Sequence, residues 1–264
     1  NESHPVMNLV LFKDAIEHVL RIARGITMPQ GHMLLVGLGG SGSQSLVRLA
    51  AYLAGYRVYQ ITLANNYGLA EFSQDLVKCF TQSGGKKQPT VFLLTDSQVI
   101  DEQFLIPISD FLSTGVLPDI FAQEDKENVY TAVKGDMKVQ GIPFTPEDAW
   151  KFFTNRVRQY CRIVFCQSPS GDTFRIRARR FPALVNCMII DWFHAWPDDA
   201  LYSVAKQFLS DVDLGGNDQE TIVQFIANAH SKVIQISAEY LEAERRHNYA
   251  TPKSYLELIS LFKT

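Results

Sequence analysis

Short apolar runs alternate with helix-like patterns through most of the chain. Residues 11–26 carry apolar side chains every three or four positions and charged ones on the other face, the period of an amphipathic helix. Strand-like apolar runs occupy five segments: 32–36, 56–63, 90–95, 161–168 and 184–190. Helical patterns lie among them at 43–55, 69–83, 105–112 and 146–158. This alternation predicts an α/β fold, with a parallel sheet covered by helices on both faces.

Two connections read as loops. The stretch 115–136 is rich in polar and turn-forming residues. The segment 83–88 contains two glycines followed by two lysines, which is typical of a solvent-exposed turn. We therefore expect loops in both places, the second of them exposed.

The pattern changes in the last part of the chain. Three helices without intervening strands are expected there: 197–211, 221–246 and 252–262. A polar loop at 213–220 separates the first two, and Thr251 and Pro252 give the N-cap and first-turn signals of the third. We therefore expect a large α/β domain at 1–196 and a small all-helical domain at 197–264.

Composition narrows the classes of function. Of 264 residues, 46% are hydrophobic and 20% charged, ordinary values for a globular protein. The net charge of −3 gives no reason to expect nucleic acid or a membrane surface as a partner. No apolar run is long enough to span a bilayer. The start lacks a signal-peptide layout and an initiator Met, so we expect a piece of a longer chain.

The cysteines and histidines suggest no catalytic or metal site. Cys79, Cys161, Cys166 and Cys187 form no CxxC pair and have no histidine at ligand spacing. This predicts reduced, mostly buried thiols in an intracellular protein. The six histidines lack the Ser, Cys or Asp neighbours of a triad, and we take them as structural.

A glycine-rich segment follows the first apolar run. Gly37-Leu38-Gly39-Gly40-Ser41-Gly42 comes after a predicted strand and before a predicted helix, the setting of a loop that cradles phosphates with backbone N–H groups. The full pattern, G-x-x-x-x-G-K-[ST], continues with Lys and a hydroxyl residue. Ser43 and Gln44 stand at those positions, and Ser45 comes one place late. The loop thus keeps its glycine frame without the cation.

Two other interpretations of the loop stay open. Gly37, Gly39 and Gly42 also fit the G-x-G-x-x-G of a dinucleotide fold. However, Tyr59-Gln60-Ile61 stands where that fold places a ribose-binding acid. The third interpretation is a glycine turn with a structural role only. A degenerate phosphate loop is the interpretation we favour.

A phosphate loop works with polar residues that end two further strands. One acid holds magnesium, and a second residue positions the attacking water. The strand 90–95 ends in Thr95-Asp96, which offers a single carboxylate for these roles or for capping the next turn. Ser168 ends the strand 161–168, where a polar sensor of the γ-phosphate normally sits. The catalytic set is therefore incomplete.

Several segments together carry a family resemblance: LVLFKDAIEHVLRI, QGHMLLVGLGGSGSQSLVRLAA, YQITLANNYGLAEFSQDL, TVFLLTDSQVIDEQFLIPISDFLSTGVLPDIF, SPSGDTFRIRARRFPALVNCMIIDWFHAWPDDAL and YATPKSYLELISLF. Over nearly its whole length the chain resembles the fourth AAA+ module of an axonemal (ciliary or flagellar) dynein heavy chain. The last segment is similar to the one that precedes the coiled-coil stalk carrying the microtubule-binding domain. The stalk itself is absent from this sequence.

The resemblance assigns nucleotide-binding roles. The loop Gly37 to Gly42 would wrap the phosphates, and Val10, Leu11 and Phe12 would lie near the adenine. Active modules of the family carry Lys at the position of Ser43, and axonemal relatives often carry Arg or Lys there. This loop is therefore depleted even within the family that it resembles.

The resemblance also identifies the remaining substituted positions. Active modules carry Thr or Ser at the position of Gln44, acidic residues at Thr95 and Asp96, and Asn at Ser168. Related cytoplasmic dyneins carry an Arg at Cys187 that could reach the preceding module. No guanidinium is available at that position here.

Two further clusters have competing interpretations. Four arginines follow the fourth strand: Arg175, Arg177, Arg179 and Arg180. They contact a neighbouring module, or they form a solvated face or make local salt bridges. The aromatic segment 191–196 is expected to pack at the hinge between the two domains.

The expected function is therefore structural or regulatory. The resemblance implies a motor-ring module. Because the loop Lys and the magnesium-holding Asp are replaced by Ser43 and Thr95, we expect weak binding of ATP or ADP, negligible ATP hydrolysis and an incomplete Mg²⁺ site. Its implied partners are neighbouring AAA+ modules and, through the stalk, microtubules, in minus-end-directed motility of cilia or flagella. The implied location is the cytoplasmic cytoskeleton of the axoneme. The alternative is an active NTPase that uses Ser45 and Asp96 at a rearranged metal site.

Overall fold

The computed structural model describes residues 9–210, 212 and 218–263. The described residues fall into two compact units. The sheet unit comprises 19–36 and 46–192, and the helical unit comprises 1–18, 37–45 and 193–264. One break between the units falls after Trp192, and the glycine loop belongs to the helical unit. The boundary expected at residue 196 remains a prediction.

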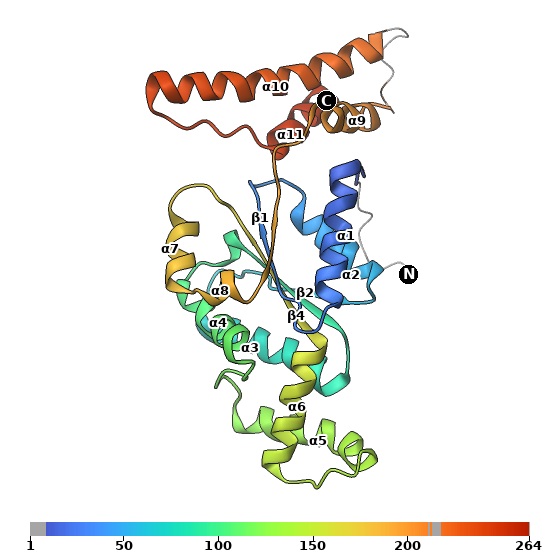
Figure 1. Cartoon of the computed structure of the whole chain (residues 1–264), viewed down its shortest axis with the longest axis vertical. Coiled ribbons are helices and arrows are strands. Elements are labelled where there is room, and N and C mark those ends of the chain that lie inside the picture. The colour runs from blue at the N-terminus through green and yellow to red at the C-terminus, as the bar shows by residue number, and fades with distance from the viewer. Residues whose placement is uncertain (1–8, 211, 213–217, 264) are drawn as a thin grey trace. The chain divides into compact units, whose positions relative to one another are not determined.

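A five-stranded parallel sheet forms the centre of the sheet unit (Figure 1). Its strands are β1 (Met33–Val36), β2 (Arg57–Gln60), β3 (Thr90–Thr95), β4 (Cys161–Gln167) and β5 (Ile189–Trp192), in the order β2-β3-β4-β1-β5. Every residue of β3 and β4 is buried, because these strands have neighbours on both sides and helices over both faces. The carboxyl ends of all five strands lie at one edge of the sheet.

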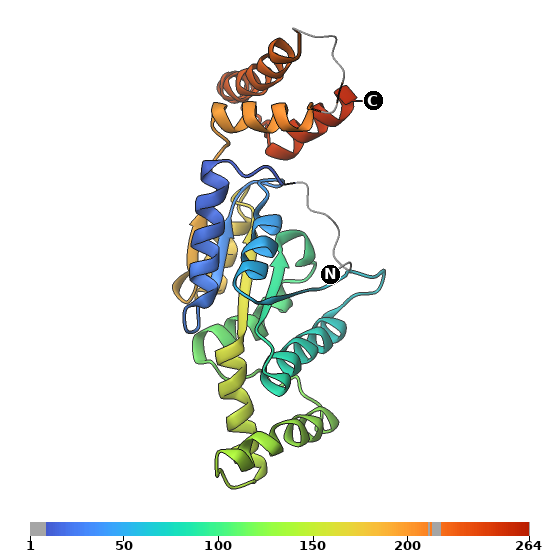
Figure 2. The ribbon, with the colours of Figure 1, turned by 90° about the vertical axis from the view of Figure 1, so that its right-hand side faces the viewer.

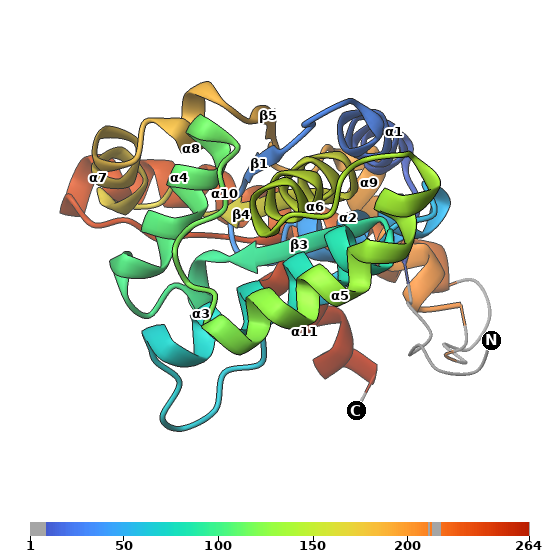
Figure 3. The same cartoon turned by 90° about the horizontal axis from the view of Figure 1, so that it is seen from below.

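Helices cover both faces of this sheet, as the view from below shows (Figure 3). The helices of the first 192 residues are α1 (Lys13–Thr27), α2 (Ser43–Leu53), α3 (Leu69–Phe80), α4 (Leu105–Thr114), α5 (Gln123–Val139), α6 (Pro146–Tyr160), α7 (Thr173–Arg180) and α8 (Ala183–Asn186). The parts of α1 and α2 within this unit lie on one face, and α4, α7 and α8 on the other. Right-handed crossovers place α2 and α4 on opposite faces, because the chain crosses the sheet in opposite directions from β1 to β2 and from β3 to β4. The α/β prediction is confirmed.

The helical unit contains α9 (Asp198–Phe208), α10 (Asp218–Glu244) and α11 (Pro252–Lys263), seen again in Figure 2. Its core contains the fully buried Tyr255, whose hydroxyl donates to the carbonyl of Leu201 at 2.7 Å. Thr251 caps α11, and Pro252 begins it, as predicted. Of the polar loop expected at 213–220, residues 218–220 belong to α10, and 213–217 lie outside the described residues.

Two local predictions between residues 115 and 190 were wrong, and one helix there was missed. The supposed loop 115–136 contains most of α5, whose apolar face consists of Val129, Val133 and Met137. These residues are four positions apart and buried, but the polar residues between them hid the period. Helix α7 was not predicted. The strand expected at 184–190 begins only at Ile189, because α8 occupies its first residues.

The segment predicted as an exposed turn at 83–88 is partly core. Thr81–Gly85 form a π-helical turn in which Ser83, Gly84 and Gly85 are buried. A Cβ atom on Gly84 would lie 2.5 Å from the ring of Phe153. The glycines are therefore explained by close packing against α6 rather than by solvent exposure.

Candidate functional site

The glycine loop connects β1 directly to α2. Gly40 and Gly42 have φ angles of +83° and +86°, which side-chain-bearing residues adopt only with strain. The Ser41 N–H donates to the carbonyl of Leu38 at 3.1 Å, closing a turn. The glycine frame read from the sequence is thus a loop whose backbone conformation depends on glycine.

One side of the loop is packed, and the other is open. A Cβ atom on Gly37 would lie 2.7 Å from the Phe193 side chain, and one on Gly40 would lie 2.2 Å from Cβ of Lys253. Nothing lies within 4 Å of the Cβ positions of Gly39 and Gly42. Within the described chain, the N–H groups of Gly39, Gly40 and Gly42 donate no hydrogen bond. The loop therefore offers unpaired donors at the N-terminus of α2, an arrangement suited to phosphate.

The loop carries no cation of its own. Ser43 is the first residue of α2 and is half-buried, Gln44 is exposed, and Ser45 is half-buried one position further on. Lys253, the second residue of α11, packs its backbone and Cβ against Gly40. Its ammonium group is exposed and lies 3.7 Å from the carboxylate of Glu257. Sequence reasoning located the start of α11 but had no signal for this contact.

A small cavity adjoins the loop inside the helical unit. It is lined by Leu38 and Ser41 of the loop, by residues 193–196, and by His230 of α10, among others. Its volume is about 30 Å³, far below that of a nucleotide-sized site, which is on the order of several hundred Å³. Burial lowers the pKa of His230, so this imidazole is neutral at pH 7. In this conformation the cavity has no room for a nucleotide base.

The residues expected near the adenine lie in the same unit as the loop. Val10 and Phe12 pack against the helical core, and the Phe12 ring meets the Trp196 ring edge-on at 5.3 Å. Leu11 is exposed. Their role toward a base remains a prediction.

At the end of β3, Thr95 acts as a cap. Its backbone N–H and its hydroxyl both donate to Oε1 of Gln98, each at 3.0 Å. The Gln98 amide in turn donates to the carbonyl of Ile61 at 2.7 Å. Thr95 therefore helps to hold a short 3₁₀ turn, Asp96–Gln98, instead of presenting an acid.

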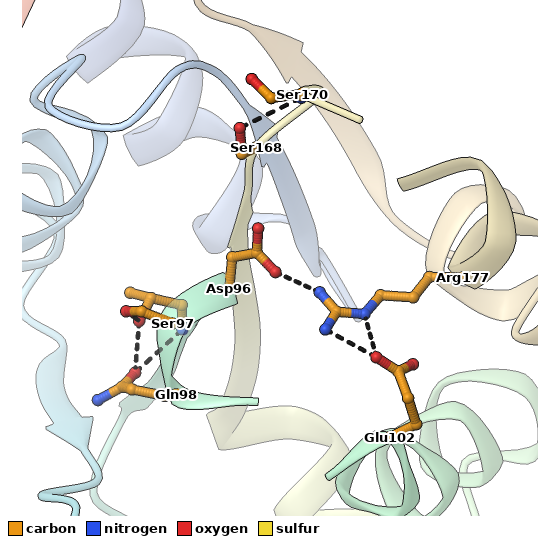
Figure 4. Close-up of polar contacts among 8 residues, drawn as sticks. Asp96, Ser97, Gln98, Glu102, Ser168, Ser170 and Arg177 are labelled. Atoms are coloured by element: carbon orange, nitrogen blue, oxygen red, sulfur yellow. Dashed lines mark hydrogen bonds and ion pairs between the residues drawn. The ribbon is translucent and has the colours of Figure 1, made fainter. Parts of the chain in front are cut away.

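The one carboxylate at this strand end is engaged by an arginine (Figure 4). The Arg177 guanidinium of α7 donates to Asp96 through Nη1 and to Oε1 of Glu102 through Nε and Nη2, the last two at 2.8 Å. The Arg177 side chain is only 5% exposed, and each carboxylate is 34% exposed. Neither alternative considered for Asp96, a metal ligand or a helix cap, describes this bridge.

The arginine cluster divides accordingly. Arg177 makes local salt bridges, as one interpretation held, whereas Arg175, Arg179 and Arg180 are exposed. Arg175 lies 4.0 Å from the carboxylate of Asp172. A contact of the exposed arginines with another module remains a prediction.

The remaining residues singled out from the sequence lie at separate places in the structure. Ser168 follows β4, and its hydroxyl oxygen accepts from the Ser170 N–H at 3.2 Å, a local turn (Figure 4). Cys187 follows α8 and is exposed, while Cys79, Cys161 and Cys166 are buried free thiols. Within the described residues, Trp192 packs edge-on against Phe174 in the sheet unit. Trp196 contacts Tyr255 in the helical unit.

These residues fit an anion better than a metal ion. The loop offers backbone donors, which bind phosphate oxygens. Magnesium needs oxygen ligands, and the expected positions hold Thr95, engaged as a cap, and Asp96, engaged by Arg177. Across the part of the chain that the structure describes, no group of three or more His, Cys, Asp or Glu side chains could hold a metal ion. No described helix is long and apolar enough to cross a membrane.

Comparison with known proteins places this geometry in a family. The family model described as "P-loop containing dynein motor region D4" matches residues 7–264. Among curated relatives, the dynein beta chain of the flagellar outer arm of Chlamydomonas reinhardtii is 52% identical over 264 residues. The ciliary dynein beta chain of Heliocidaris crassispina is 49% identical over 265 residues, and dynein axonemal heavy chain 17 of Homo sapiens is 46% identical over 264.

Each match covers 100% of this chain but only 6% of the relative. The names of these relatives place them in flagella, cilia or the axoneme. The glycine loop after β1, the parallel sheet and the helical unit agree with that match. The chain belongs to the P-loop-containing dynein motor region D4 family.

Proposed function

We propose that these residues form the fourth AAA+ module of an axonemal dynein heavy chain, binding ADP or ATP weakly with negligible hydrolysis. The designation D4 in the family description supports the fourth position. The relatives, all named as dynein chains of cilia, flagella or the axoneme, support the axonemal type. We further propose that residues 1–196 and 197–264 act as its large and small subdomains.

The ion pair between Asp96 and Arg177 carries the proposal. Phosphoryl transfer depends on cations and acids held where charge develops. Here Asp96 is neutralised from within the protein, Thr95 caps a turn, and Ser43 replaces the loop lysine. Each missing group costs roughly 10²–10³ in rate, so together they leave little turnover.

Without the catalytic groups, the module retains weak nucleotide binding. The unpaired N–H groups of Gly39, Gly40 and Gly42 at the N-terminus of α2 support an attraction for phosphate. The cavity described beside the loop is only about 30 Å³, too small to enclose a base, which supports low affinity. Without a complete metal site, this binding should depend little on Mg²⁺.

The alternative, an active NTPase using Ser45 and Asp96, requires Asp96 to be available as a ligand. Oδ1 of that carboxylate is engaged by a buried guanidinium, so a metal ion at Asp96 would have to share the group with a cation already bound there. The contact therefore favours a structural or regulatory role in the motor. In that role the module takes part in ATP-driven, minus-end-directed movement through neighbouring modules and a microtubule-binding stalk.

Calorimetric titration of the purified chain with ADP and ATP, each with and without Mg²⁺, tests the proposal. We expect dissociation constants well above the low micromolar range, with little change on adding Mg²⁺. Low micromolar ATP binding that requires Mg²⁺ would refute it and reopen the NTPase alternative.

A further inference from the structure

The described part of the helical unit contains two buried polar side chains, Ser41 of the glycine loop and His230 of α10. They are 7% and 8% exposed. Among the described residues, neither the Ser41 hydroxyl nor the His230 imidazole forms a hydrogen bond. Buried polar groups of folded proteins are nearly always hydrogen-bonded. We therefore expect both side chains to bind a polar group from outside the described chain.

Ser41 and His230 line the same small cavity, the one beside the glycine loop. Most of the other residues around it are apolar or aromatic, among them Leu38, Phe193 and Trp196. Its volume of about 30 Å³ has room for one or two water-sized groups. The group that fits between the two polar side chains is therefore a single oxygen, whereas a ring is too large.

The surroundings of His230 keep its imidazole neutral. Its ring packs against the Tyr255 ring at a centroid distance of 4.9 Å. Burial lowers the pKa of His230, and no charged neighbour among the described residues contributes to that shift. Burial likewise raises the pKa of Tyr255, so the phenol is also uncharged at pH 7. A negative charge in the cavity would favour the protonated imidazole, because an opposite charge nearby raises the pKa of a base.

The charged groups on the elements around His230 are engaged or exposed. On α9, Asp198 accepts from the hydroxyl of Ser231 at 2.6 Å. On α11, the Lys253 ammonium forms an ion pair within its own helix. His194 also lines the cavity, and its side chain is exposed. His194 is therefore the competing proton acceptor that a test must separate from His230.

Ser41 connects the cavity to the donor side of the glycine loop. It stands between Gly40 and Gly42, whose N–H groups are unpaired within the described chain. A phosphate held by these donors lies within one residue of the cavity wall. A phosphate oxygen has the size that the cavity admits and the negative charge that a hydroxyl and an imidazolium bind well.

We propose that Ser41 and His230 together bind one phosphate oxygen of a nucleotide on the glycine loop, and that His230 takes up a proton from solvent as it does so. The resulting imidazolium supplies the positive charge that Ser43, at the position of the loop lysine, cannot. This inference rests on the proposed function, because it adds a binding group for the same phosphates. Nucleotide binding should strengthen as the pH falls, since the complex holds more protons than the free module.

Calorimetric titration with ADP at pH 7, in two buffers of different ionisation enthalpy, measures the protons taken up on binding. We expect about half a proton or more for the unmodified chain. His230→Gln keeps a hydrogen-bond donor but does not titrate, so uptake should fall to near zero and ADP binding should weaken about fivefold. His247→Gln makes the same change at an exposed histidine outside the cavity lining, and this matched control should behave as the unmodified chain.

A second measurement needs no substitution. NMR signals of the His230 ring, assigned through its contact with Tyr255, report its pKa directly. Inorganic pyrophosphate should raise that pKa, because the anion stabilises the charged ring. This measurement remains decisive even if His230→Gln loosens the core of the helical unit.

Proton uptake that persists in His230→Gln, or that disappears in His194→Gln instead, would overturn the inference. A His230 pKa that pyrophosphate leaves unchanged would do the same. These titrations also separate the inference from the proposed function. Weak, Mg²⁺-independent ADP binding without proton uptake removes the inference alone, whereas tight, Mg²⁺-dependent ATP binding with uptake through His230 removes the proposed function alone.

Discussion

The glycine loop and the end of β3 both depart from the phosphate-loop pattern, but they retain different chemistry. In the loop, the N–H groups of Gly39, Gly40 and Gly42 stay available because they belong to the main chain. At the end of β3, Thr95 has become a cap and Asp96 an ion-pair partner. Main-chain donors therefore stay unpaired in the loop, whereas the side chains at the end of β3 are engaged.

The two regions also differ in what their residues are needed for. Gly40 is fixed by a positive φ angle and by the nearby backbone of Lys253, so its identity is needed for folding whether or not nucleotide binds. Asp96 is the ion-pair partner of Arg177, and this contact links the end of β3 to α7. A degenerate site of this kind should lose turnover before it loses its shape.

The largest expected effect is on the ion-pair side of the comparison. Arg177→Met leaves two neighbouring carboxylates without their cation, and we expect unfolding free energy to fall by about 3 kcal/mol. Urea unfolding measures this change in the free energy of unfolding. Arg175→Met is the control, because Arg175 is exposed and should cost about 0.5 kcal/mol or less. Equal effects of the two substitutions would contradict the structural role of Arg177.

The glycine loop should show a slightly smaller effect. Gly40→Ala introduces a Cβ atom at a φ of +83° and within 3 Å of Lys253 backbone atoms, so we expect a loss of about 2 kcal/mol. Gly39→Ala places its Cβ atom in open space and serves as the matched control. Thermal unfolding distinguishes them. A Gly39→Ala loss as large as that of Gly40→Ala would argue against the packed side of the loop.

Acid pH should weaken the sheet that carries both regions. Burial, and secondarily the Arg162 charge, lower the pKa of His32 from 6.5 to about 4, and its Nδ1 accepts from the Ile163 N–H at 3.0 Å. The unfolded chain therefore takes up a proton below pH 6.5 that the folded chain refuses. From pH 7 to pH 5 we expect a loss of about 2 kcal/mol.

Urea unfolding at both pH values checks this loss. His32→Gln should flatten the pH dependence, since Gln can still accept the Ile163 N–H but does not titrate. An unchanged slope in the variant would assign the acid sensitivity to other groups.

The smallest expected effect concerns the missing loop cation. Ser43→Lys should tighten ADP binding about tenfold, or about 1.4 kcal/mol, by placing a positive charge beside the phosphates. Ser43→Gln, which is similar in polarity but uncharged, should leave affinity unchanged. We expect no turnover in either variant, because Asp96 remains paired with Arg177. Hydrolysis by Ser43→Lys would mean that the loop alone was limiting.

Local sequence patterns were enough to predict much of the fold. The run 90–95 is β3 with the same bounds. An apolar run flanked by threonines can be recognised as a buried strand without knowing which strands lie beside it. Helix α5 was missed because its buried residues, Val129, Val133 and Met137, form a narrow stripe among polar ones. The π-helical turn at 81–85 was missed because two glycines were attributed to a turn instead of to close packing.

The candidate site was less predictable, for a physical reason. The glycine frame is a local pattern, and its place after β1 and before α2 followed from the sequence. Asp96 and Arg177 lie 81 positions apart, and their contact depends on where α7 packs. The contact between Gly40 and Lys253 likewise depends on tertiary structure. Residue types therefore indicated what was missing, but not how the remaining groups are engaged.

Phosphate release by the purified chain at saturating ATP and Mg²⁺ tests the central claim most directly. We expect a rate indistinguishable from a protein-free blank, since Thr95 caps a turn and Asp96, the one carboxylate at the end of β3, is paired with Arg177. Steady turnover that disappears in the Asp96→Asn variant would contradict that account and show that Asp96 acts in catalysis despite its pairing with Arg177.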